Sequence, residues 1–378
     1  MKYKFRKLLS LLLRYPKSVR GETYYPECKR KSTFAILRDQ LYFFWKYGDV
    51  EPFYYTYGFD RVGFTRKKMC DEYIIPYAHF MKKVNYLNFN NPRYDSFHGK
   101  LTGRVITGDK FYFNIFLERF GIPTPKVYCF IKDKKPLYFH PDYNIDPAMS
   151  PESQLKSFLS KDMDAFAKPS DGQLGNGVFS LKIENGRIFM DGKESSIGQL
   201  MEVLLSADYL IQERIVQHPK ISALCSTTLN SIRLQTVMDL EGNVIPFGAG
   251  LRMGREGSYV DNWAKGGIFV GIDPETGKMR DRGFLKPVYG TSAFAHLDSK
   301  VVFKDYEIPF FHEAVQLAVK LHSYLYRCHS VGWDIAITEK GPVFIEANGL
   351  WEISLIQAAN GGMKHVEKFF DCAALDAD

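Results

Sequence analysis

The sequence lacks several patterns that assign a protein to a class directly. Its six cysteines, scattered from Cys28 to Cys372, form no CxxC pair and have no histidines at zinc spacing. We therefore expect no disulfide framework, no zinc site, and a reducing, cytoplasmic compartment. The apolar run from Leu8 to Leu13 is too short to span a bilayer, and no small-residue cleavage site follows it. We accordingly expect neither a transmembrane helix nor a signal peptide.

Nucleic-acid-binding patterns are absent as well, although the formal net charge is +7, from 50 Lys+Arg against 43 Asp+Glu. A modest positive excess suits an anionic ligand or a membrane surface as well as nucleic acid. Because no nucleic-acid module accompanies the charge, we expect no nucleic-acid partner. The basic segment Lys2–Arg20 either lies on the inner face of an anionic membrane as a short amphipathic helix or packs on its own domain.

What remains is an ordinary globular composition, with 45% hydrophobic and 25% charged residues in a chain of 378. Residues 1–100 are rich in Tyr, Phe and basic residues, and they show helical patterns, as in the segment 32–47. We expect these aromatic residues to form a core. Further along, strands and helices alternate without a regular βαβ period, and no internal repeats occur. The sequence therefore predicts an α+β fold with mostly antiparallel sheets and an N-terminal helical region.

One hairpin, over 331–349, gathers the polar residues on which our functional hypothesis rests. A long amphipathic helix over Pro309–Ser330 leads into it. If the loop is centred on Lys340, Asp334 lies directly opposite Glu346, with Cβ atoms about 4.5–5.5 Å apart. Alternation along the two strands places the following on the side opposite to the polar groups: Trp333, Ile335, Ile337, Val343, Ile345 and Ala347. Phe344 would share the polar side.

The polar side of this hairpin carries three oxygen donors, namely Asp334, Glu346 and Asn348. Carboxylate and amide oxygens are ligands that Mg²⁺ takes, with waters and substrate phosphates completing its coordination. The sequence therefore predicts a magnesium site here. The alternative is an ordinary hairpin whose acids face water.

A second polar feature is a glycine-rich loop between two predicted strands, with Lys168 just before it. The sequence runs from DAFAK through PSDGQLGNG into VFSLKI. Gly172, Gly175 and Gly177 lack the Cβ that would prevent backbone N–H groups from approaching phosphate oxygens. The loop is neither a P-loop nor a Rossmann fingerprint. Glycines that serve only the turn geometry are the alternative.

Taken in order, the polar landmarks are Lys110, Lys168 with its loop, Gln212-Glu213, Asn230 with Arg233, and the three oxygen donors of the hairpin. Their order resembles the ATP-grasp superfamily. The wording around them, including DKFYFNIFLERFGIPTP, FAKPSDGQLGNGV, YLIQERI, TLNSIRLQT and GWDIAITEKGPVFIEANG, resembles the sugar-transfer-associated ATP-grasp branch, which is similar to α-L-glutamate ligase-related proteins. The resemblance implies an ATP-grasp domain over 101–378, after an N-terminal region over 1–100. Its parts would be a lead-in segment (101–163), a glycine-loop nucleotide subdomain (164–215) and a metal-binding and catalytic subdomain (216–378).

The resemblance also implies ATP and Mg²⁺ as cofactors, and a role for each landmark. Lys110 would reach the α-phosphate side of the nucleotide, and Lys168 would bridge phosphates as a point charge. Glu213 would accept hydrogen bonds from the ribose hydroxyls. The other nucleotide contacts would come from Asp171, Gly172, Gly175, Asn176, Gly177, Gln212 and Ile215. Gln212 could instead be an edge residue without such a role.

Catalysis would rest on Arg233 and Lys168, helped by Asn230 and Arg252. Arg233 would stabilise the transferring phosphoryl group, and Asn230 would help to orient it. Alternatively, Arg233 forms a sheet-face ion pair and Asn230 is a turn residue. Arg252 is also a candidate for binding the carboxylate or the acceptor, and two residues of the following polar loop, Asn262 and Lys265, are others.

The expected activity is that of an ATP- and Mg²⁺-dependent carboxylate–amine ligase working through an acyl phosphate. A small-molecule carboxylate would be joined to an amine or a sugar-linked acceptor in bacterial surface polysaccharide synthesis. Such a reaction needs positioning and electrostatic stabilisation but no protein nucleophile. The alternatives are a kinase on the same fold, which phosphorylates a sugar-type hydroxyl, and a nucleotide-binding scaffold without ligase activity.

Overall fold

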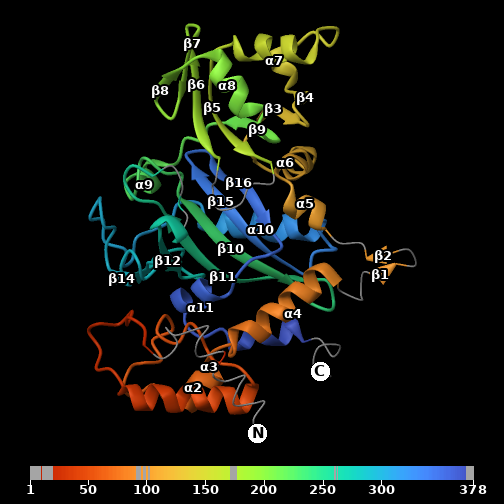
Figure 1. The fold of residues 1–378 in the computed structure, drawn as a ribbon. Helices are drawn as coiled ribbons and strands as arrows, with labels where there is room; N and C mark the ends of the chain where they lie inside the picture. The colour runs from red at the N-terminus through yellow and green to blue at the C-terminus, as the bar shows by residue number, and fades with distance from the viewer. Residues whose placement is uncertain are drawn as a thin grey trace.

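The computed structural model describes residues 10, 20–90, 95–96, 99–100, 103–170, 177–258, 261 and 263–371. These residues form three layers along the long axis of the molecule (Figure 1). The N-terminal helices lie at one end, a seven-stranded sheet lies in the middle, and another seven-stranded sheet lies at the far end. Of the segment expected to contact a membrane, Lys2–Arg20, only Ser10 and Arg20 belong to the described residues.

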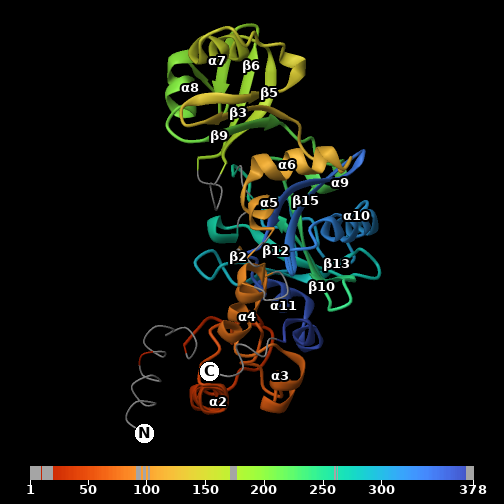
Figure 2. The same cartoon turned by 90° about the vertical axis from the view of Figure 1, so that its right-hand side faces the viewer.

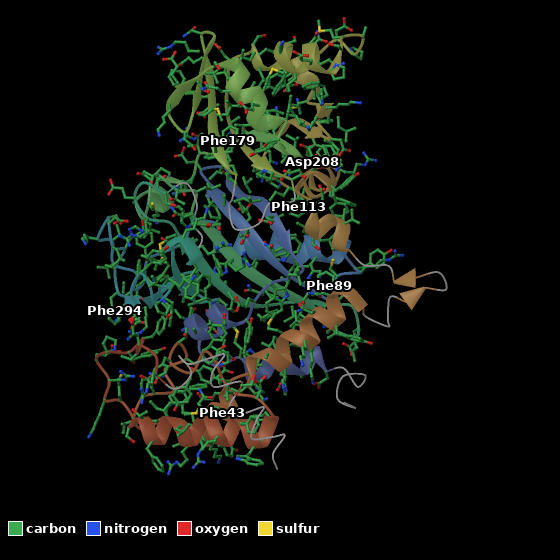
Figure 3. The ribbon with its side chains drawn as sticks, in the orientation of Figure 1. Phe43, Phe89, Phe113, Phe179, Asp208 and Phe294 are labelled. Atoms are coloured by element: carbon green, nitrogen blue, oxygen red, sulfur yellow. The ribbon has the colours of Figure 1, made fainter. Side chains whose placement is uncertain are left out.

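An aromatic core holds the N-terminal layer together, as expected. Helix α2 (Thr33–Tyr47) begins after Ser32, whose hydroxyl accepts a hydrogen bond from the Ala35 N–H, and ends at Gly48 in the left-handed conformation. Helices α3 (Arg66–Glu72) and α4 (Tyr77–Asn90) follow. The buried rings include Phe43, Tyr54, Tyr57, Phe59 and Tyr73, and the same cluster contains Phe284 and Trp351 from the middle layer. Figure 3 shows Phe43 between α2 and the rest of this layer.

The far layer, which we call the first sheet, is antiparallel throughout, in the order β4-β3-β9-β5-β6-β7-β8. Its strands are β3 (Val127–Lys132), β4 (Lys135–Phe139), β5 (Met163–Pro169), β6 (Phe179–Glu184), β7 (Arg187–Met190), β8 (Lys193–Ser195) and β9 (Tyr209–Glu213). Helices α7 (Pro151–Leu159) and α8 (Ile197–Leu204) cover one face and bury a core there (Figure 2). The glycine-rich segment therefore connects two adjacent central strands, β5 and β6.

The middle layer, which we call the second sheet, has the order β14-β13-β12-β11-β10-β15-β16 and is also antiparallel. Its strands are β10 (Ser231–Met238), β11 (Val244–Met253), β12 (Ile268–Ile272), β13 (Met279–Phe284), β14 (Ser292–Ala293), β15 (Ser330–Thr338) and β16 (Gly341–Asn348). Helix α10 (Phe311–Tyr324) packs on one face through a buried stripe. Short elements complete the layer and its connections: β1 (Asp95–Ser96), β2 (Gly99–Lys100), α5 (Arg104–Gly108), α6 (Lys110–Arg119), α9 (Pro219–Ser222) and α11 (Ser354–Asn360). The α+β class with antiparallel sheets is thus confirmed.

Helix α10 is shorter than the expected span of residues 309–330. It begins after Phe310, which has a left-handed φ of 55°, and its last helical residue is Tyr324. By Ser330 the chain has already joined the sheet, because Ser330 pairs with Val237 of β10. The predicted stripe is nevertheless buried, from Phe311 through Ala318 to Leu325.

The hairpin β15–β16 confirms one register prediction and corrects another. Asp334 pairs with Glu346, as the sequence predicted. The strands, however, contain a bulge: Ile335 pairs with Phe344, so Ile345 is an extra residue on β16. Phe344 therefore turns into the core, where it is fully buried against Trp333, instead of sharing the polar side with Glu346.

The other face of the second sheet lies unusually close to α11 because the strands carry glycines there. A Cβ on Gly248 would lie 2.5 Å from Ile356 Cγ2. A Cβ on Gly332 would lie 2.7 Å from the Cβ of Trp351. Only glycine permits this close packing. The same face of the sheet also carries Arg233, Arg252 and Asp334. Among the described helices, none is long and apolar enough to cross a membrane.

Candidate active site

Two arginines hold the carboxylate of Asp334 on this face of the second sheet. Arg233 lies opposite Asp334 in the β10–β15 register, and its Nε and Nη2 donate to Oδ1 and Oδ2 at 2.7 and 2.9 Å. Arg252 of β11 donates from Nη1 to the same oxygens at 3.1 and 3.2 Å. Burial by itself would raise the pKa of Asp334, but the two guanidinium groups outweigh it and hold the pKa below its usual value. The arrangement is a charged cluster with one carboxylate between two cations.

Asp261 extends this cluster, and sequence reasoning missed it. Its Oδ1 lies 3.7 Å from Arg252 Nη2, and Ser231 Oγ donates a short hydrogen bond to its Oδ2. Burial keeps the pKa of Asp261 above its usual value although Arg252 lies beside it. Of the two acceptor candidates in the same loop, Asn262 lies outside the described residues, and Lys265 is exposed in a single 3-10 turn. The sequence signal for Asp261 was an acidic residue in the loop that follows the strand of Arg252.

Glu346 connects the second sheet to α6. Its Oε1 lies 3.8 Å from the Nζ of Lys110, the first residue of α6. Asp109 caps that helix by accepting from two backbone N–H groups, which places Lys110 at the end of the helix nearest the hairpin. Lys110 Nζ also donates to the carbonyl oxygen of Ser170 at 3.5 Å, at the base of the glycine loop. One lysine therefore links the hairpin, α6 and the first sheet.

Lys168 lies near the end of β5 and points its charge toward the same place. Burial lowers the pKa of its ammonium group to about 8, with Lys110 adding repulsion and Glu346 opposing the shift. Within the described part of the chain, its Nζ forms neither an ion pair nor a hydrogen bond. A desolvated ammonium group without a protein partner is suited to binding an anion.

The glycine loop is described only at its end. Asp171, Gly172, Gly175 and Asn176 lie outside the described residues. Gly177 has φ +72°, and a Cβ there would lie 2.9 Å from Pro169 Cγ, so glycine is required. The Tyr209 hydroxyl donates to the Gly177 carbonyl oxygen at 3.1 Å and fixes the exit of the loop.

Strand β9 supplies the residues expected to meet adenine and ribose. Gln212 is buried, and its Nε2 has no hydrogen-bond partner among the described residues. Glu213 is exposed and accepts from the Lys126 N–H at 3.3 Å, and Ile215 is half-buried two residues further on. A buried amide donor without a partner is costly unless a ligand or water satisfies it.

Asn230 is held by hydrogen bonds within the protein, and its expected catalytic role stays a prediction. The side chain is buried, and its Nδ2 donates to the carbonyl oxygen of Cys225 at 2.8 Å and to Gln217 Oε1 at 3.2 Å. Its Oδ1 accepts from the Gly254 N–H at 3.3 Å. Asn230 therefore fixes the segment before β10 to the end of β11.

Comparison with known protein families tests the resemblance to ATP-grasp proteins. The family model for sugar-transfer associated ATP-grasp proteins matches residues 89–369. The chain belongs to this family. A search of curated proteins finds no match.

Among solved structures, this ATP-grasp protein is similar to D-alanine–D-alanine ligase from Helicobacter pylori (13% identity, TM-score 0.40, 70% of this chain and 60% of that one). It is also similar to biotin carboxylase from Campylobacter jejuni (14%, 0.40, 70% and 46%) and to the ATP-grasp ligase PsnB (13%, 0.38, 76% and 63%). The chain thus spans less than two thirds of the length of each of these proteins. The likeness concerns the fold alone.

The residues present fit the nucleotide and the metal that an ATP-grasp fold implies. Lys110, Lys168 and the buried amide of Gln212 are placed to bind phosphates and a base. Glu346 and Asn348 supply a carboxylate and an amide oxygen, which are ligands that Mg²⁺ accepts. Asp334 is different, because the arginines and Asn348 Nδ2 already donate to both of its oxygens. Its role as a ligand stays a prediction that requires one arginine to turn away. Among the described residues, no three or more His, Cys, Asp or Glu side chains are grouped so that they could hold a metal ion.

Proposed function

We propose that this ATP-grasp protein is an ATP- and Mg²⁺-dependent carboxylate–amine ligase. The observation that carries the proposal is the meeting of four cationic side chains from both sheets and α6 around the carboxylates of Glu346 and Asp334. Lys110 and Lys168 approach from α6 and the first sheet, and Arg233 and Arg252 from the second. Such a cluster stabilises negative charge that builds up on a phosphate and on an attacking carboxylate.

In the proposed reaction, an oxygen of the substrate carboxylate attacks the γ-phosphorus of ATP, and ADP leaves. The acyl phosphate so formed is attacked at its carbonyl carbon by an amine, which loses a proton as inorganic phosphate departs. Lys168 and Lys110 hold the phosphates, while Arg233 and Arg252 bind the acyl phosphate oxygens once they leave Asp334. Bound Mg²⁺ would neutralise charge on the phosphates. No side chain forms a covalent bond.

The two arginines favour this chemistry because they are already gathered at one carboxylate. Asp334 holds both guanidinium groups on one face of the second sheet, from which they can exchange this carboxylate for the oxygens of the acyl phosphate. Arg252 is held at a second point by Asp261. We propose that the acceptor is an amine on a small molecule or a sugar-linked group in surface polysaccharide or glycoconjugate synthesis, in line with the family's association with sugar transfer.

Trapping with hydroxylamine tests the proposal. The purified chain is incubated with ATP, Mg²⁺, hydroxylamine and a panel of amino acids and other carboxylates. A ligase releases ADP together with a hydroxamate, because hydroxylamine captures the acyl phosphate. A stable phosphate ester on a sugar hydroxyl would instead identify a kinase. Nucleotide binding without ADP release from any substrate would identify a scaffold, and either result would overturn the proposal.

A matched pair of variants ties the reaction to the site. Arg252→Lys keeps the positive charge beside Asp334 and Asp261, so the fold should persist, but it loses the second nitrogen that bridges them. Hydroxamate formation should fall by about 100-fold or more. Arg187→Lys, on exposed β7, should leave it unchanged.

A further inference from the structure

The outer side of α2 carries a stripe of apolar side chains. Phe34 and Trp45 are 76% and 60% exposed. They lie eleven residues apart, which is three helical turns, so they share one line along the helix. Leu41 falls on the same line, and Arg38 lies beside it. In both views α2 lies at the end of the molecule farthest from the first sheet (Figures 1 and 2).

Positive charge surrounds this stripe. Arg38 and Lys46 are exposed on α2 itself, and Arg66–Lys68 begin α3, with Asp71–Glu72 at its end as a partial offset. Glu22 and Glu27 are also exposed. The buried acids of this layer are Asp39, Glu51 and Asp60. Exposed basic residues nevertheless outnumber exposed acids over residues 20–90.

The chain that precedes Arg20 adds to this charge. Residues 1–20 include seven Lys+Arg (Lys2, Lys4, Arg6, Lys7, Arg14, Lys17 and Arg20) and no Asp or Glu. This segment ends at Arg20, which lines a pocket at the start of α2.

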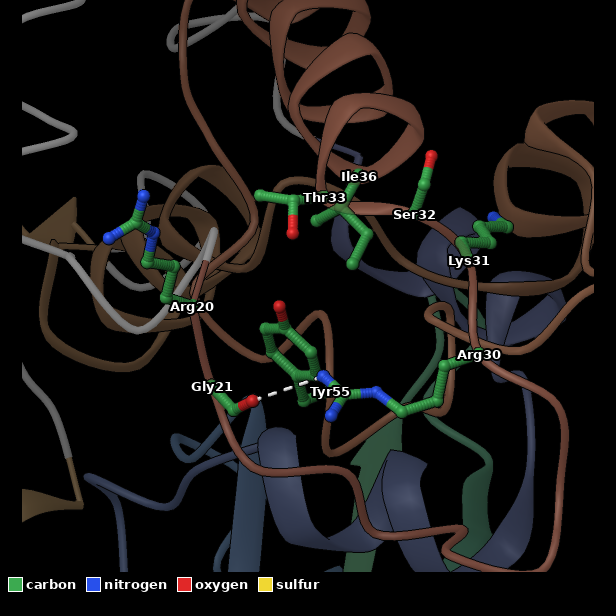
Figure 4. A pocket seen from close by; sticks show the side chains of 8 residues that line it. All are labelled: Arg20, Gly21, Arg30, Lys31, Ser32, Thr33, Ile36 and Tyr55. Carbon is green, nitrogen blue, oxygen red and sulfur yellow. Dashed lines mark hydrogen bonds between the residues drawn. The ribbon is translucent and has the colours of Figure 1, made fainter.

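That pocket has a volume of about 450 Å³ and is lined largely by polar groups. Figure 4 shows the hydroxyls of Thr33 and Tyr55 facing one another across it. Arg30 lies beside them and donates to the Gly21 carbonyl oxygen at 3.2 Å. The Lys31 ammonium is turned elsewhere, to Asp39 at 2.9 Å. Arg20 and Arg30 thus place two guanidinium groups beside the first turn of α2.

We propose that the outer face of α2, defined by Phe34, Arg38, Leu41 and Trp45, docks on an anionic lipid bilayer. The helix would lie in the plane of the interface, with its aromatic rings among the acyl chains and the cations at the headgroups. Charge complementarity favours this occupant over a second copy of the chain, which would bring like charges together. The candidate active site, in the middle and far layers, would face the aqueous phase.

Co-sedimentation with vesicles tests the docking. The full chain should bind vesicles of phosphatidylglycerol and phosphatidylcholine, and bind phosphatidylcholine alone much more weakly. Raising the salt concentration should weaken the binding, because exposed charges are screened. The affinity of the double variant Phe34→Ser/Trp45→Ser for these vesicles should be lower by about tenfold or more, since two large apolar groups no longer leave water. Both residues are exposed, so its affinity for an ATP analogue should match the wild type and confirm folding.

Leu137→Ser provides the control. Leu137 is 63% exposed on β4, in the layer farthest from α2, and its loss should leave vesicle binding unchanged. Full binding by the double variant would overturn the proposal and assign any membrane contact to residues 1–20. A dimer in solution that the double variant abolishes, without vesicle binding, would also overturn it and make a second copy the occupant.

Discussion

At the scale of single residues, the site combines groups that are tightly paired with groups that are held unpaired. Asp334, Arg233 and Arg252 satisfy one another, whereas Gln212 Nε2 and Lys168 Nζ have no partner among the described residues. Folding alone does not favour the second group, because burying an ammonium or an amide without a partner is costly. Their positions therefore point to a ligand.

Lys168 gives a pH dependence. Its pKa of about 8 means that the side chain is charged below pH 8 and loses its charge as the pH rises through that value. Affinity for a non-hydrolysable ATP analogue should therefore be highest below pH 8 and weaken by about tenfold above it. Titration calorimetry at several pH values measures this change. Lys168→Arg should show no decline over the same range, and a decline of equal size in that variant would refute the assignment.

The Mg²⁺ dependence of turnover should require Glu346. Glu346→Ala should lower Mg²⁺-dependent turnover by about 100-fold or more, because it removes the most available carboxylate ligand. The melting temperature should hardly change, since the side chain is about one third exposed and, among the described residues, makes a single long ion pair with Lys110. Assays of ADP release over a Mg²⁺ titration measure the effect, with exposed Glu184→Ala as control. Unchanged turnover would remove the hairpin from the metal site.

At the scale of elements, the hairpin shows how far counting along a sequence can reach. The predicted pairing of Asp334 with Glu346 is correct, yet the turn joins Thr338 to Gly341 and is not centred on Lys340. The bulge at Ile345 supplies the missing residue and separates Phe344 from Glu346. Bulges depend on packing, here of Phe344 against Trp333, and alternation alone does not reveal them. Alternation and helical periodicity likewise do not reveal the short elements β4, β13 and α11, because tertiary contacts stabilise them.

The site shows the same limit. Spacing and family order were enough to pick Lys110, Lys168 and Glu346, which the structure brings together. They could not show that Asn230 is enclosed by Gln217 and Cys225, or that Asp261 reaches Arg252. Both facts depend on loops that fold back onto the ends of β10 and β11.

A buried hydrogen-bond chain supports β15 from the opposite face. Trp333 Nε1 donates to Thr236 Oγ1 at 2.8 Å, and Thr236 lies 2.7 Å from His322 Nδ1. His322 Nε2 must donate to the Cys328 carbonyl oxygen, which can only accept, so Nδ1 is the unprotonated nitrogen. Burial lowers the pKa of His322 to about 4. The chain therefore requires a neutral histidine.

Because this hydrogen-bond chain requires a neutral His322, the folded protein should be less stable in acid. Between pH 6.5 and 4 the unfolded state binds a proton that native His322 does not, so stability falls as the pH falls. The free energy of unfolding should decrease by about 2–3 kcal/mol between pH 7 and 4.5 from this group. Urea titrations at both pH values measure the loss, and His322→Gln should show a smaller one. An equal loss in the variant would attribute the sensitivity to other groups.

At the scale of the whole molecule, the N-terminal layer is built into the second sheet. Asn88 of α4 donates to the Gly349 carbonyl oxygen at 2.7 Å, just after Asn348, and accepts from the Ser330 N–H at 2.9 Å. Gln357 of α11 exchanges two hydrogen bonds with the backbone of Ile74. The aromatic core also includes Trp351. The division of the chain at residue 100 stays a prediction, and these contacts argue that the two parts fold together.

Calorimetric unfolding of the full chain should therefore not show a separate transition for the N-terminal layer. Asn88→Ala leaves a buried N–H of Ser330 and a buried carbonyl of Gly349 without this partner, which should destabilise the protein by about 1–3 kcal/mol. Because Gly349 follows the hairpin directly, nucleotide affinity should fall in parallel. Asn243→Ala, in the exposed turn between β10 and β11, should change neither. An N-terminal layer that melts first in Asn88→Ala, while nucleotide binding persists, would show instead that it is an independent domain attached to the ATP-grasp sheets.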